Sequence, residues 1–331
     1  MRLDEFDYPL PRELIAQRPL EDRSASRLLV LGAGMEHRSF RDIKDYLAPG
    51  DLLVVNDTRV VPARLRGRKG TGGRVEALLV RRVGGLWEAL VRGKNISPGT
   101  DLSFGPFRAA VRGKAGGRFL LEFDEDPFPF LGDVGEVPTP PYIKERLLDG
   151  ERYQTVYGSK PGSIAAPTAG LHFTPSLVEE LEAMGVETAH VTLHIGPGTF
   201  TPVRCQMVED HGMEPEYFEV PEGTAEAIDR REGRLFAVGT TTLKALESAC
   251  TSGRVEAASG WSDLFIYPPY RFRAPVEGLL TNFHLPRSTL LMLIAAYAGL
   301  ERVLDAYRAA VDLGYRFYSF GDAMLVFRGK L

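Results

Sequence analysis

The sequence predicts an α+β protein of two domains, in which an α/β domain with a barrel-like mixed sheet carries a small inserted antiparallel β-barrel. Strand and helix patterns alternate in residues 1–59 and again in residues 138–331, as in α/β folds. Residues 60–137 instead hold short strands separated by glycine-rich turns, which is typical of small barrels. A chain of 331 residues is long enough for two cores. We therefore assign 1–59 and 138–331 to the α/β domain and 60–137 to the inserted barrel.

The first segment of the α/β domain ends in a polar run that follows a buried strand. Its expected elements are a short helix within residues 4–20, a strand over 27–31, an amphipathic helix over 40–47 and a strand over 51–55. The run that follows is Asn56-Asp57-Thr58-Arg59. Ligands of α/β sheets gather at the carboxyl ends of strands, which makes Asn56, Asp57 and Arg59 candidate substrate-binding residues. A simple turn closed by an Asn or Asp side chain explains the same run equally well.

The predicted barrel concentrates positive charge in an otherwise acidic chain. Its strands are expected over 75–80, 86–91, 107–111 and 119–123. The whole chain has a net charge of −4, yet residues 59–118 carry +11 and residues 119–151 carry −7. An arginine-rich block of this kind is typical of a phosphate-binding surface, and Arg64, Arg66 and Arg68 are its candidate residues. A solvated surface without a ligand accounts for the block equally well.

Residues 161–175 form a long stretch of small residues around one imidazole, that of His172. Small residues allow a ligand to approach the backbone, so Thr168, Ala169 and Gly170 are candidate substrate-binding residues. Thr174 and Pro175 predict the start of a helix, whose free N–H groups suit an anion. His172 is a candidate catalytic residue. The alternative is a tight turn with a purely structural role.

An alternating strand over 186–195 follows, and a second glycine-rich turn comes directly after it. Thr188, His190, Thr192 and His194 share one face of this strand. His194 at its end is a second candidate catalytic residue, and Gly198 and Thr199 in the turn are candidate substrate-binding residues. His190 and His194 lie about 13 Å apart on a strand, too far to share a metal ion. A solvated face is the alternative interpretation.

The rest of the chain returns to strands and helices. Expected elements are strands over 235–239, 263–267 and 315–320, a strand that passes into a loop over 279–286, and helices over 243–250, 289–298 and 301–311. Polar residues at their junctions are candidate substrate-binding residues: Gly239, Thr240, Thr241, Asn282, His284 and Asp322. The run Glu209-Asp210-His211 places two acids beside an imidazole, and we add all three to the catalytic candidates. A surface turn explains this run about as well.

Several classes of protein are excluded by what the sequence lacks. It contains no P-loop, dinucleotide fingerprint, nucleophile elbow or HExxH motif. Two cysteines, Cys205 and Cys250, exclude a Cys-ligated cluster and suit a reducing cytoplasm. No apolar run is long enough for a membrane span, and the first residues lack a secretion signal. We expect a cytoplasmic monomer that needs no metal.

Taken together, the motifs resemble the S-adenosylmethionine:tRNA ribosyltransferase-isomerase family of queuosine biosynthesis, from one end of the chain to the other. The matching stretches lie at residues 56–67, 135–143, 153–157, 165–174, 190–196, 198–200, 209–211, 239–241, 263–268, 281–286 and 318–324. The chain departs from the family pattern at Thr139, Lys244 and Pro269. Lysine for the expected arginine at 244 keeps the charge but loses the planar fork.

The resemblance implies a reaction and two substrates. A ribosyl unit of S-adenosylmethionine is transferred to the aminomethyl group of a 7-deazaguanine at the tRNA wobble position, giving epoxyqueuosine, and adenine and methionine leave. S-adenosylmethionine is then a co-substrate, no other cofactor is implied, and Arg64, Arg66 and Arg68 become tRNA contacts. The resemblance does not identify the base. A non-catalytic RNA-binding protein or an ordinary methyltransferase are the alternatives, and neither releases adenine.

Overall fold

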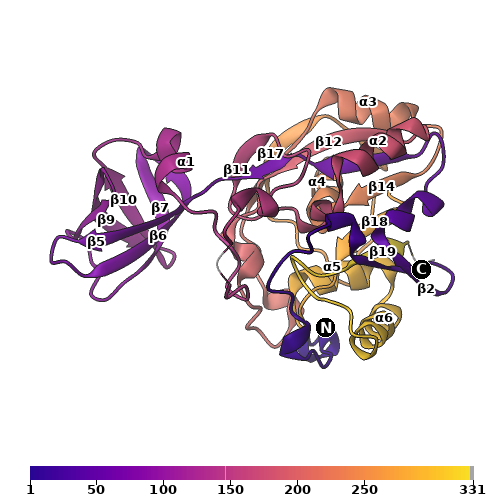
Figure 1. Cartoon of the computed structure of the whole chain (residues 1–331), viewed down its shortest axis with the longest axis horizontal. Helices are drawn as coiled ribbons and strands as arrows, with labels where there is room; N and C mark the ends of the chain where they lie inside the picture. The colour runs from indigo at the N-terminus through magenta and orange to yellow at the C-terminus, as the bar shows by residue number, and fades with distance from the viewer. Residues whose placement is uncertain (146, 329–331) are drawn as a thin grey trace. The chain divides into compact units, whose positions relative to one another are not determined.

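The computed structural model describes residues 1–145 and 147–328, which divide into two compact units (Figure 1). The larger unit comprises residues 1–59, 141–161 and 166 onward. The smaller unit comprises residues 60–140 together with 162–165. The smaller unit therefore takes in a short piece of the glycine- and alanine-rich stretch 161–175.

The larger unit is built on a nine-stranded mixed sheet with the order β17-β13-β12-β3-β14-β18-β19-β1-β2. Its strands are β1 (Arg27–Leu31), β2 (Met35–Ser39), β3 (Leu52–Asn56), β12 (Glu187–Leu193), β13 (Glu216–Val220), β14 (Leu235–Val238), β17 (Ala258–Ser262), β18 (Gly278–Asn282) and β19 (Ala323–Phe327). The central strands β12, β3, β14 and β18 run parallel, so their carboxyl ends meet at one edge of the sheet. Short pairs β4 (Thr58–Val60) with β11 (Lys160–Ser163) and β15 (Cys250–Thr251) with β16 (Arg254–Val255) complete the strands outside the barrel.

Helices cover both faces of this sheet. They are α2 (Pro175–Ala183), α3 (Glu222–Arg230), α4 (Thr240–Ser248), α5 (Thr289–Ala298) and α6 (Leu300–Asp312), and α5 and α6 lie side by side (Figure 1). On one face, Leu177 and Leu181 of α2 pack in a core with Leu53 and Val55 of β3. Side chains alternate along a strand, so Asn56, which hydrogen-bonds to α4, belongs to the opposite face. The carboxyl end of β3 thus lies between α2 on one face of the sheet and α4 on the other.

The smaller unit is a closed antiparallel barrel with the order β10-β7-β6-β5-β8-β9 (Figure 1). Its strands are β5 (Arg64–Lys69), β6 (Arg74–Val83), β7 (Leu86–Arg92), β8 (Asp101–Phe104), β9 (Phe107–Ala115) and β10 (Arg118–Phe123), and the short helix α1 (Leu131–Val134) follows. Leu65, Val111 and Leu121 fill its interior together with other apolar residues. The predicted fold class, an α/β domain with an inserted all-β barrel, is confirmed.

Local sequence signals placed several elements correctly. Thr174 caps α2 by accepting a hydrogen bond from the Leu177 N–H at 3.2 Å, with Pro175 as the first helical residue. Ser288 caps α5 in the same way. The predicted helix within residues 4–20 is instead two single 3₁₀ turns, Leu3–Phe6 and Arg12–Leu14, since prolines interrupt the segment. The segment 40–47 is also 3₁₀, over Phe40–Tyr46.

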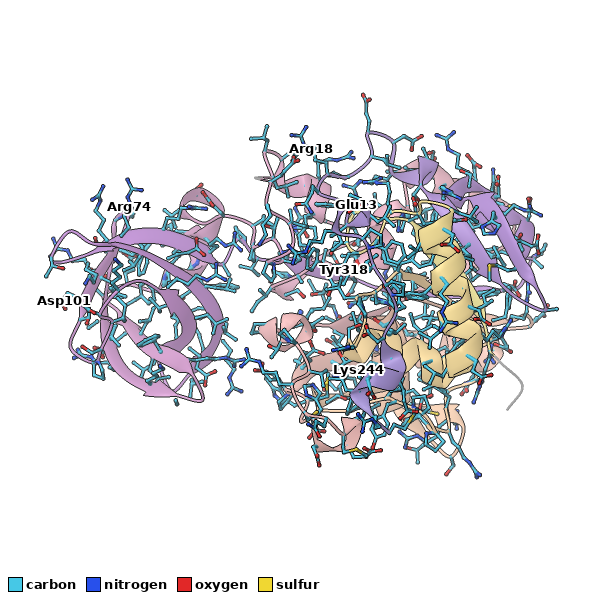
Figure 2. The ribbon with its side chains drawn as sticks, turned by 90° about the horizontal axis from the view of Figure 1, so that it is seen from below. Glu13, Arg18, Arg74, Asp101, Lys244 and Tyr318 are labelled. Atoms are coloured by element: carbon cyan, nitrogen blue, oxygen red, sulfur yellow. The ribbon has the colours of Figure 1, made fainter. Side chains whose placement is uncertain are left out.

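Two predicted strands are wrong. Residues 263–267 are irregular, and the strand β17 ends just before them at Ser262. Residues 315–320 form a loop, because Tyr318, labelled in Figure 2, has a φ of 75° that no strand accommodates. The aromatic residues of this loop pack in the interior, where Phe317 lies 5.0 Å from Phe283 between ring centroids. Apolar alternation there reflects a buried loop, and the real strand β19 starts at Ala323.

Candidate active site

The carboxyl ends of the parallel strands carry the polar residues that the sequence singled out. Asn56 ends β3 and is fully buried. Its amide group donates to the Leu193 carbonyl at 3.0 Å and to Thr241 Oγ1 at 3.1 Å, and its Oδ1 accepts from the N–H groups of Thr58 and Leu193. Every hydrogen-bonding position of this side chain is thus occupied within the protein. Asn56 ties β3, β12 and α4 together and positions Thr241, which makes it a structural clamp at this edge.

His194 lies at the same edge, one residue beyond the end of β12. Its Nδ1 is 2.8 Å from Thr58 Oγ1, and its ring stacks on Tyr217 with centroids 5.8 Å apart. Among the described residues no hydrogen bond reaches its Nε2. Burial lowers the pKa of His194, while Asp57 opposes that shift. The ring is therefore held by one nitrogen, neutral at pH 7, and has a second nitrogen available for a proton.

Asp57 stabilises the end of β12, which carries His194. Its Oδ1 accepts a hydrogen bond from Thr192 Oγ1 at 2.6 Å, and its backbone carbonyl accepts from the N–H groups of Ser159 and Lys160. The carboxylate is buried, with 6% of the residue exposed. Arg59, in contrast, lies at the surface and pairs with Glu151 at 2.5 Å. The polar run therefore divides into buried supports and a surface ion pair.

The turn after His194 is anchored by a buried ion pair. Glu216 on β13 accepts at Oε1 from the Gly196 N–H at 3.0 Å and from Thr199 Oγ1 at 3.1 Å. Its Oε2 accepts from Lys244 Nζ of α4 at 3.0 Å, and both side chains are only 7% exposed. Lys244 lies inside the larger unit (Figure 2). Gly198 packs closely against Glu214. The carboxylate thus fixes the turn and α4 relative to each other.

Helix α4 begins at this edge, and no side chain of the described residues caps it. Gly239 precedes it with a φ of 96°, a conformation that favours glycine. Thr240 and Thr241 form the first turn, so the strand-to-helix junction lies three residues earlier than expected. Thr240 is buried, and Thr241 Oγ1 accepts from Asn56. The first N–H groups of a helix without a cap suit an anionic group.

His172 occupies a closed environment. Its Nδ1 lies 2.7 Å from Ser26 Oγ, and Asn282 Nδ2 donates to its Nε2 at 3.1 Å. The same Asn282 amide donates to the Tyr318 carbonyl at 3.1 Å, which fixes its orientation and leaves Nδ1 as the protonated nitrogen of His172. Phe40 stacks on the ring at 4.9 Å.

Both nitrogens of His172 are therefore occupied, and burial lowers its pKa to about 3, with Arg316 and Arg23 contributing. A group of this kind is a poor general base. The geometry favours the structural interpretation of this residue over the catalytic one. Asn282 Oδ1, in contrast, is buried with no hydrogen-bond partner among the described residues.

The small residues before His172 serve close packing. Residues Thr168–His172 form a 3₁₀ turn in which Ala169 and Gly170 are buried. A Cβ on Gly170 would lie 2.1 Å from the Tyr157 hydroxyl, so only glycine fits there. Ala169 belongs to the core beneath α2, while Thr168 at the start of the turn is half-buried. The backbone of the Thr168–His172 turn is therefore largely covered by protein, with Ala169 to His172 all buried.

Two further candidates have structural partners. The Asp322 carboxylate accepts from the N–H of Arg27 at 2.9 Å and from that of Arg316 at 2.8 Å, and burial raises its pKa. His284 is buried, and burial lowers its pKa to about 3. Its Nδ1 lies 3.4 Å from the Tyr307 hydroxyl. Asp322 thus ties the start of β1 to the loop before β19, and His284 contacts Tyr307 in the aromatic interior.

The run Glu209-Asp210-His211 lies apart from these residues. Glu209 is exposed and pairs with the amino group of Met1, which lowers its pKa. Asp210 is exposed too, and His211 contacts Phe265 edge-on with centroids 5.3 Å apart. Among the described residues, no hydrogen bond or ring contact of this run reaches His172 or His194. The geometry thus matches the surface-turn interpretation.

The candidate phosphate-binding arginines lie on β5 of the barrel and differ in their exposure and in their partners. Arg64 donates to the Thr139 carbonyl at 3.0 Å, and its side chain is 20% exposed. Arg66 is exposed and pairs with Glu136 at 3.0 Å. Arg68 is exposed and faces Arg74 of β6 across the ladder. Figure 2 shows Arg74 at the outside of the barrel.

The chain as a whole is similar to a family of known proteins. The model of the family described as queuosine biosynthesis protein matches residues 3–326.

The chain belongs to the queuosine biosynthesis protein family. Two relatives named S-adenosylmethionine:tRNA ribosyltransferase-isomerase, from Moorella thermoacetica and Pelotomaculum thermopropionicum, are each 54% identical over 98% of this chain and 100% of their own length. The crystal structure of S-adenosylmethionine tRNA ribosyltransferase from Thermotoga maritima covers 98% of this chain and 100% of its own, with 41% identity and a TM-score of 0.57. The resemblance seen in the sequence is confirmed.

Sequence reasoning missed three residues that shape the site in this family member: Thr58, Glu216 and Lys244. Thr58 stood inside the polar run, but only the fold shows that its hydroxyl reaches His194. Glu216 opens β13, which was not predicted. Lys244 was noticed only as a departure from the expected arginine. No group of three or more His, Cys, Asp or Glu able to hold a metal ion occurs within residues 1–145 and 147–328.

Proposed function

We propose that this chain transfers and isomerises the ribosyl moiety of S-adenosylmethionine onto 7-aminomethyl-7-deazaguanine at the tRNA wobble position. The product is epoxyqueuosine-tRNA, and adenine and methionine are released. The observation that carries the proposal is the full-length similarity to relatives that bear this activity in their name, 54% identical over 98% of the chain. S-adenosylmethionine is the co-substrate, and tRNA is the acceptor.

We assign the general base to His194. The sulfonium of S-adenosylmethionine acidifies its neighbouring 5′ carbon, so a neutral base beside that carbon is the main requirement. His194 offers a nitrogen without a partner among the described residues, while its other nitrogen is oriented by Thr58 at 2.8 Å. The lowered pKa keeps the ring unprotonated at pH 7. Both ring nitrogens of His172 are occupied by hydrogen bonds. His211 packs edge-on against Phe265, away from His194 and its partners.

We assign the substrate-facing edge to the first turn of α4 and to the turn Pro197–Phe200. The free N–H groups of Thr240 and Thr241 suit the carboxylate of the methionine moiety. Glu216 and Lys244 position both segments from within the protein. Asn56 and Asp57 act as supports in this proposal, since their side-chain hydrogen bonds are made within the protein.

We further propose that the outer face of β5–β6–β7 binds the tRNA backbone. Arg66 and Arg68 on β5, Arg74 on β6 and Arg92 on β7 surround Glu76 on this face. Each phosphate contact lowers the slope of log affinity against log salt by about 0.7 to 0.9. Replacing Arg68 and Arg74 with glutamate is expected to weaken tRNA binding and to flatten that slope. Arg112→Glu on β9, 57% exposed, is the matched control.

The reaction is tested by product analysis. Protein, S-adenosylmethionine and tRNA carrying the aminomethyl base are incubated together and with each component left out. Adenine and methionine are expected only in the complete mixture. Methylated tRNA without adenine would instead assign a methyltransferase, and tRNA binding without turnover would assign a binding protein. Within the described residues no helix has the length and apolarity of a membrane span. Separately, we propose that the protein acts in the cytoplasm because its proposed substrate is tRNA.

A further inference from the structure

Three aromatic rings form a continuous row across the last strands of the large sheet. The His194 ring stacks on Tyr217 of β13 with centroids 5.8 Å apart and an interplanar angle of 24°. Tyr217 then meets Trp261 of β17 edge-on, with centroids 5.9 Å apart. Tyr217 and Trp261 are register partners, so their side chains leave the sheet on the same face. The row therefore runs from the proposed base to the edge of the sheet.

The outer end of this row is open to solvent. Trp261 is 61% exposed, more than Phe128 and Phe130 at 41% each, and Tyr217 is half-buried. β17 ends the strand order, so no described strand covers its outer side. On the same face Lys160 and Glu219 form an ion pair at 3.2 Å. A contiguous exposed aromatic surface is more typical of an interaction site than a lone exposed ring is.

We propose that Trp261 and Tyr217 form a stacking platform for an unpaired nucleotide of the tRNA substrate. This nucleotide would lie next to the modified nucleobase that reacts beside His194. This inference rests on the proposed function and names the part of the protein that holds the nucleic acid beside the site. Sheets that expose aromatic rings bind single-stranded RNA by stacking, because every base has a π-face. Small-molecule sites are concave instead, so an open sheet edge favours an RNA loop over the adenine of S-adenosylmethionine.

Filter binding tests the platform directly. Base stacking on an aromatic side chain contributes about 1–3 kcal/mol, so Trp261→Ala is expected to weaken tRNA binding by about 5- to 150-fold. Trp261→Phe keeps a ring and is expected to stay within about threefold of the wild type, since the π-face remains. Leu313→Ala removes a side chain of similar exposure, 50%, from the end of α6 and is the matched control. Equal affinities for all four proteins would overturn the proposal.

Tryptophan fluorescence separates the RNA from the co-substrate. The chain has two tryptophans, so in a Trp87→Phe background Trp261 supplies the whole tryptophan signal. Quenching by a tRNA anticodon stem-loop, with no quenching by S-adenosylmethionine alone, is the expected result. Quenching by S-adenosylmethionine alone would assign the platform to adenine and overturn the RNA proposal. Should Trp87→Phe fail to fold, the filter-binding series still decides, because Trp261 is exposed.

The two proposals fail in different ways. If tRNA binding depends on the ring at 261 but no adenine is released, the platform stands and the proposed reaction falls. If adenine is released and binding is the same in Trp261→Ala and wild type, the reaction stands and the platform falls. The binding assay needs no turnover, so it measures the contribution of Trp261 to tRNA affinity independently of the reaction.

Discussion

His172 and His194 have similar sequence settings but opposite environments in the folded chain. Each follows or precedes a stretch of small residues, and each has one nitrogen beside a hydroxyl, from Ser26 and Thr58 respectively. The second nitrogen of His172 accepts from Asn282, while that of His194 has no partner among the described residues. Only His172 has a pKa lowered to about 3 by burial. The same chemical group is thus a structural part in one place and a candidate base in the other.

This difference explains what small residues around a histidine indicate. Near His172, glycine and alanine permit protein to pack against protein, as Gly170 does against the Tyr157 hydroxyl. Near His194, the small residues form a turn that Glu216 holds through the Gly196 N–H and the Thr199 hydroxyl, while the His194 ring is held separately by Thr58. A bare backbone therefore marks close packing as readily as ligand access. The number of free nitrogens separates the two cases.

The largest expected contrast is in stability. His172→Ala removes a buried ring and leaves Ser26 and Asn282 without their partner, which is expected to lower the free energy of unfolding by about 2–5 kcal/mol. His194→Ala removes a half-buried ring held by one hydrogen bond, and we expect a loss of about 1 kcal/mol. Denaturant titration of both variants measures the contrast. Equal losses would mean that His194 is as much a structural residue as His172.

A second contrast appears on acidification. A histidine whose pKa falls from 6.5 unfolded to about 3 folded binds its proton only in the unfolded state between those values. The unfolded state then gains protons as pH drops, so stability is complete above pH 6.5 and is lost toward pH 3, by about 1.4 kcal/mol per pH unit.

His172→Gln is expected to remove this contribution, leaving that of His284, whose pKa is also lowered to about 3. Urea titrations at several pH values between 5 and 7 read the slope. An unchanged slope in His172→Gln would show that the ring is not held neutral.

The smallest contrast concerns the two hydroxyl partners. Ser26→Ala leaves the buried Nδ1–H of His172 without an acceptor, which is expected to cost about 1–3 kcal/mol of stability with little effect on turnover. Thr58→Val keeps the shape of the side chain but releases the His194 ring. A lost hydrogen bond of about 1 kcal/mol corresponds to a rate about fivefold lower at nearly unchanged stability. The opposite pattern would exchange the roles of the two histidines.

The sequence predicted those features that depend on neighbours along the chain. The strand before the polar run 56–59, the Thr174 cap of α2 and the helix over 289–298 were all predicted from local patterns. Failures occurred where tertiary packing decided the outcome. Tyr318 adopts a left-handed conformation because its loop packs into an aromatic interior, which apolar alternation does not reveal.

In the site, the contacts that distinguish the residues all join positions far apart in the sequence. Ser26 meets His172 across 146 positions, and Thr58 meets His194 across 136. Neither pairing leaves a signal in local sequence, so local sequence does not separate the two histidines as candidate bases. The family resemblance supplied the reaction but not the base. Only the hydrogen bonds of each ring distinguish the candidates.

Single-turnover adenine release is the most direct test that His194 is the base. With saturating S-adenosylmethionine and modified tRNA, His194→Gln is expected to react about 10²–10⁴-fold more slowly while remaining folded. The wild-type rate is expected to fall at pH values below the lowered pKa of His194, where the ring gains a proton, and that dependence is expected to vanish in the variant. Wild-type turnover in His194→Gln, together with loss of turnover in a stably folded His172→Gln, would contradict the assignment.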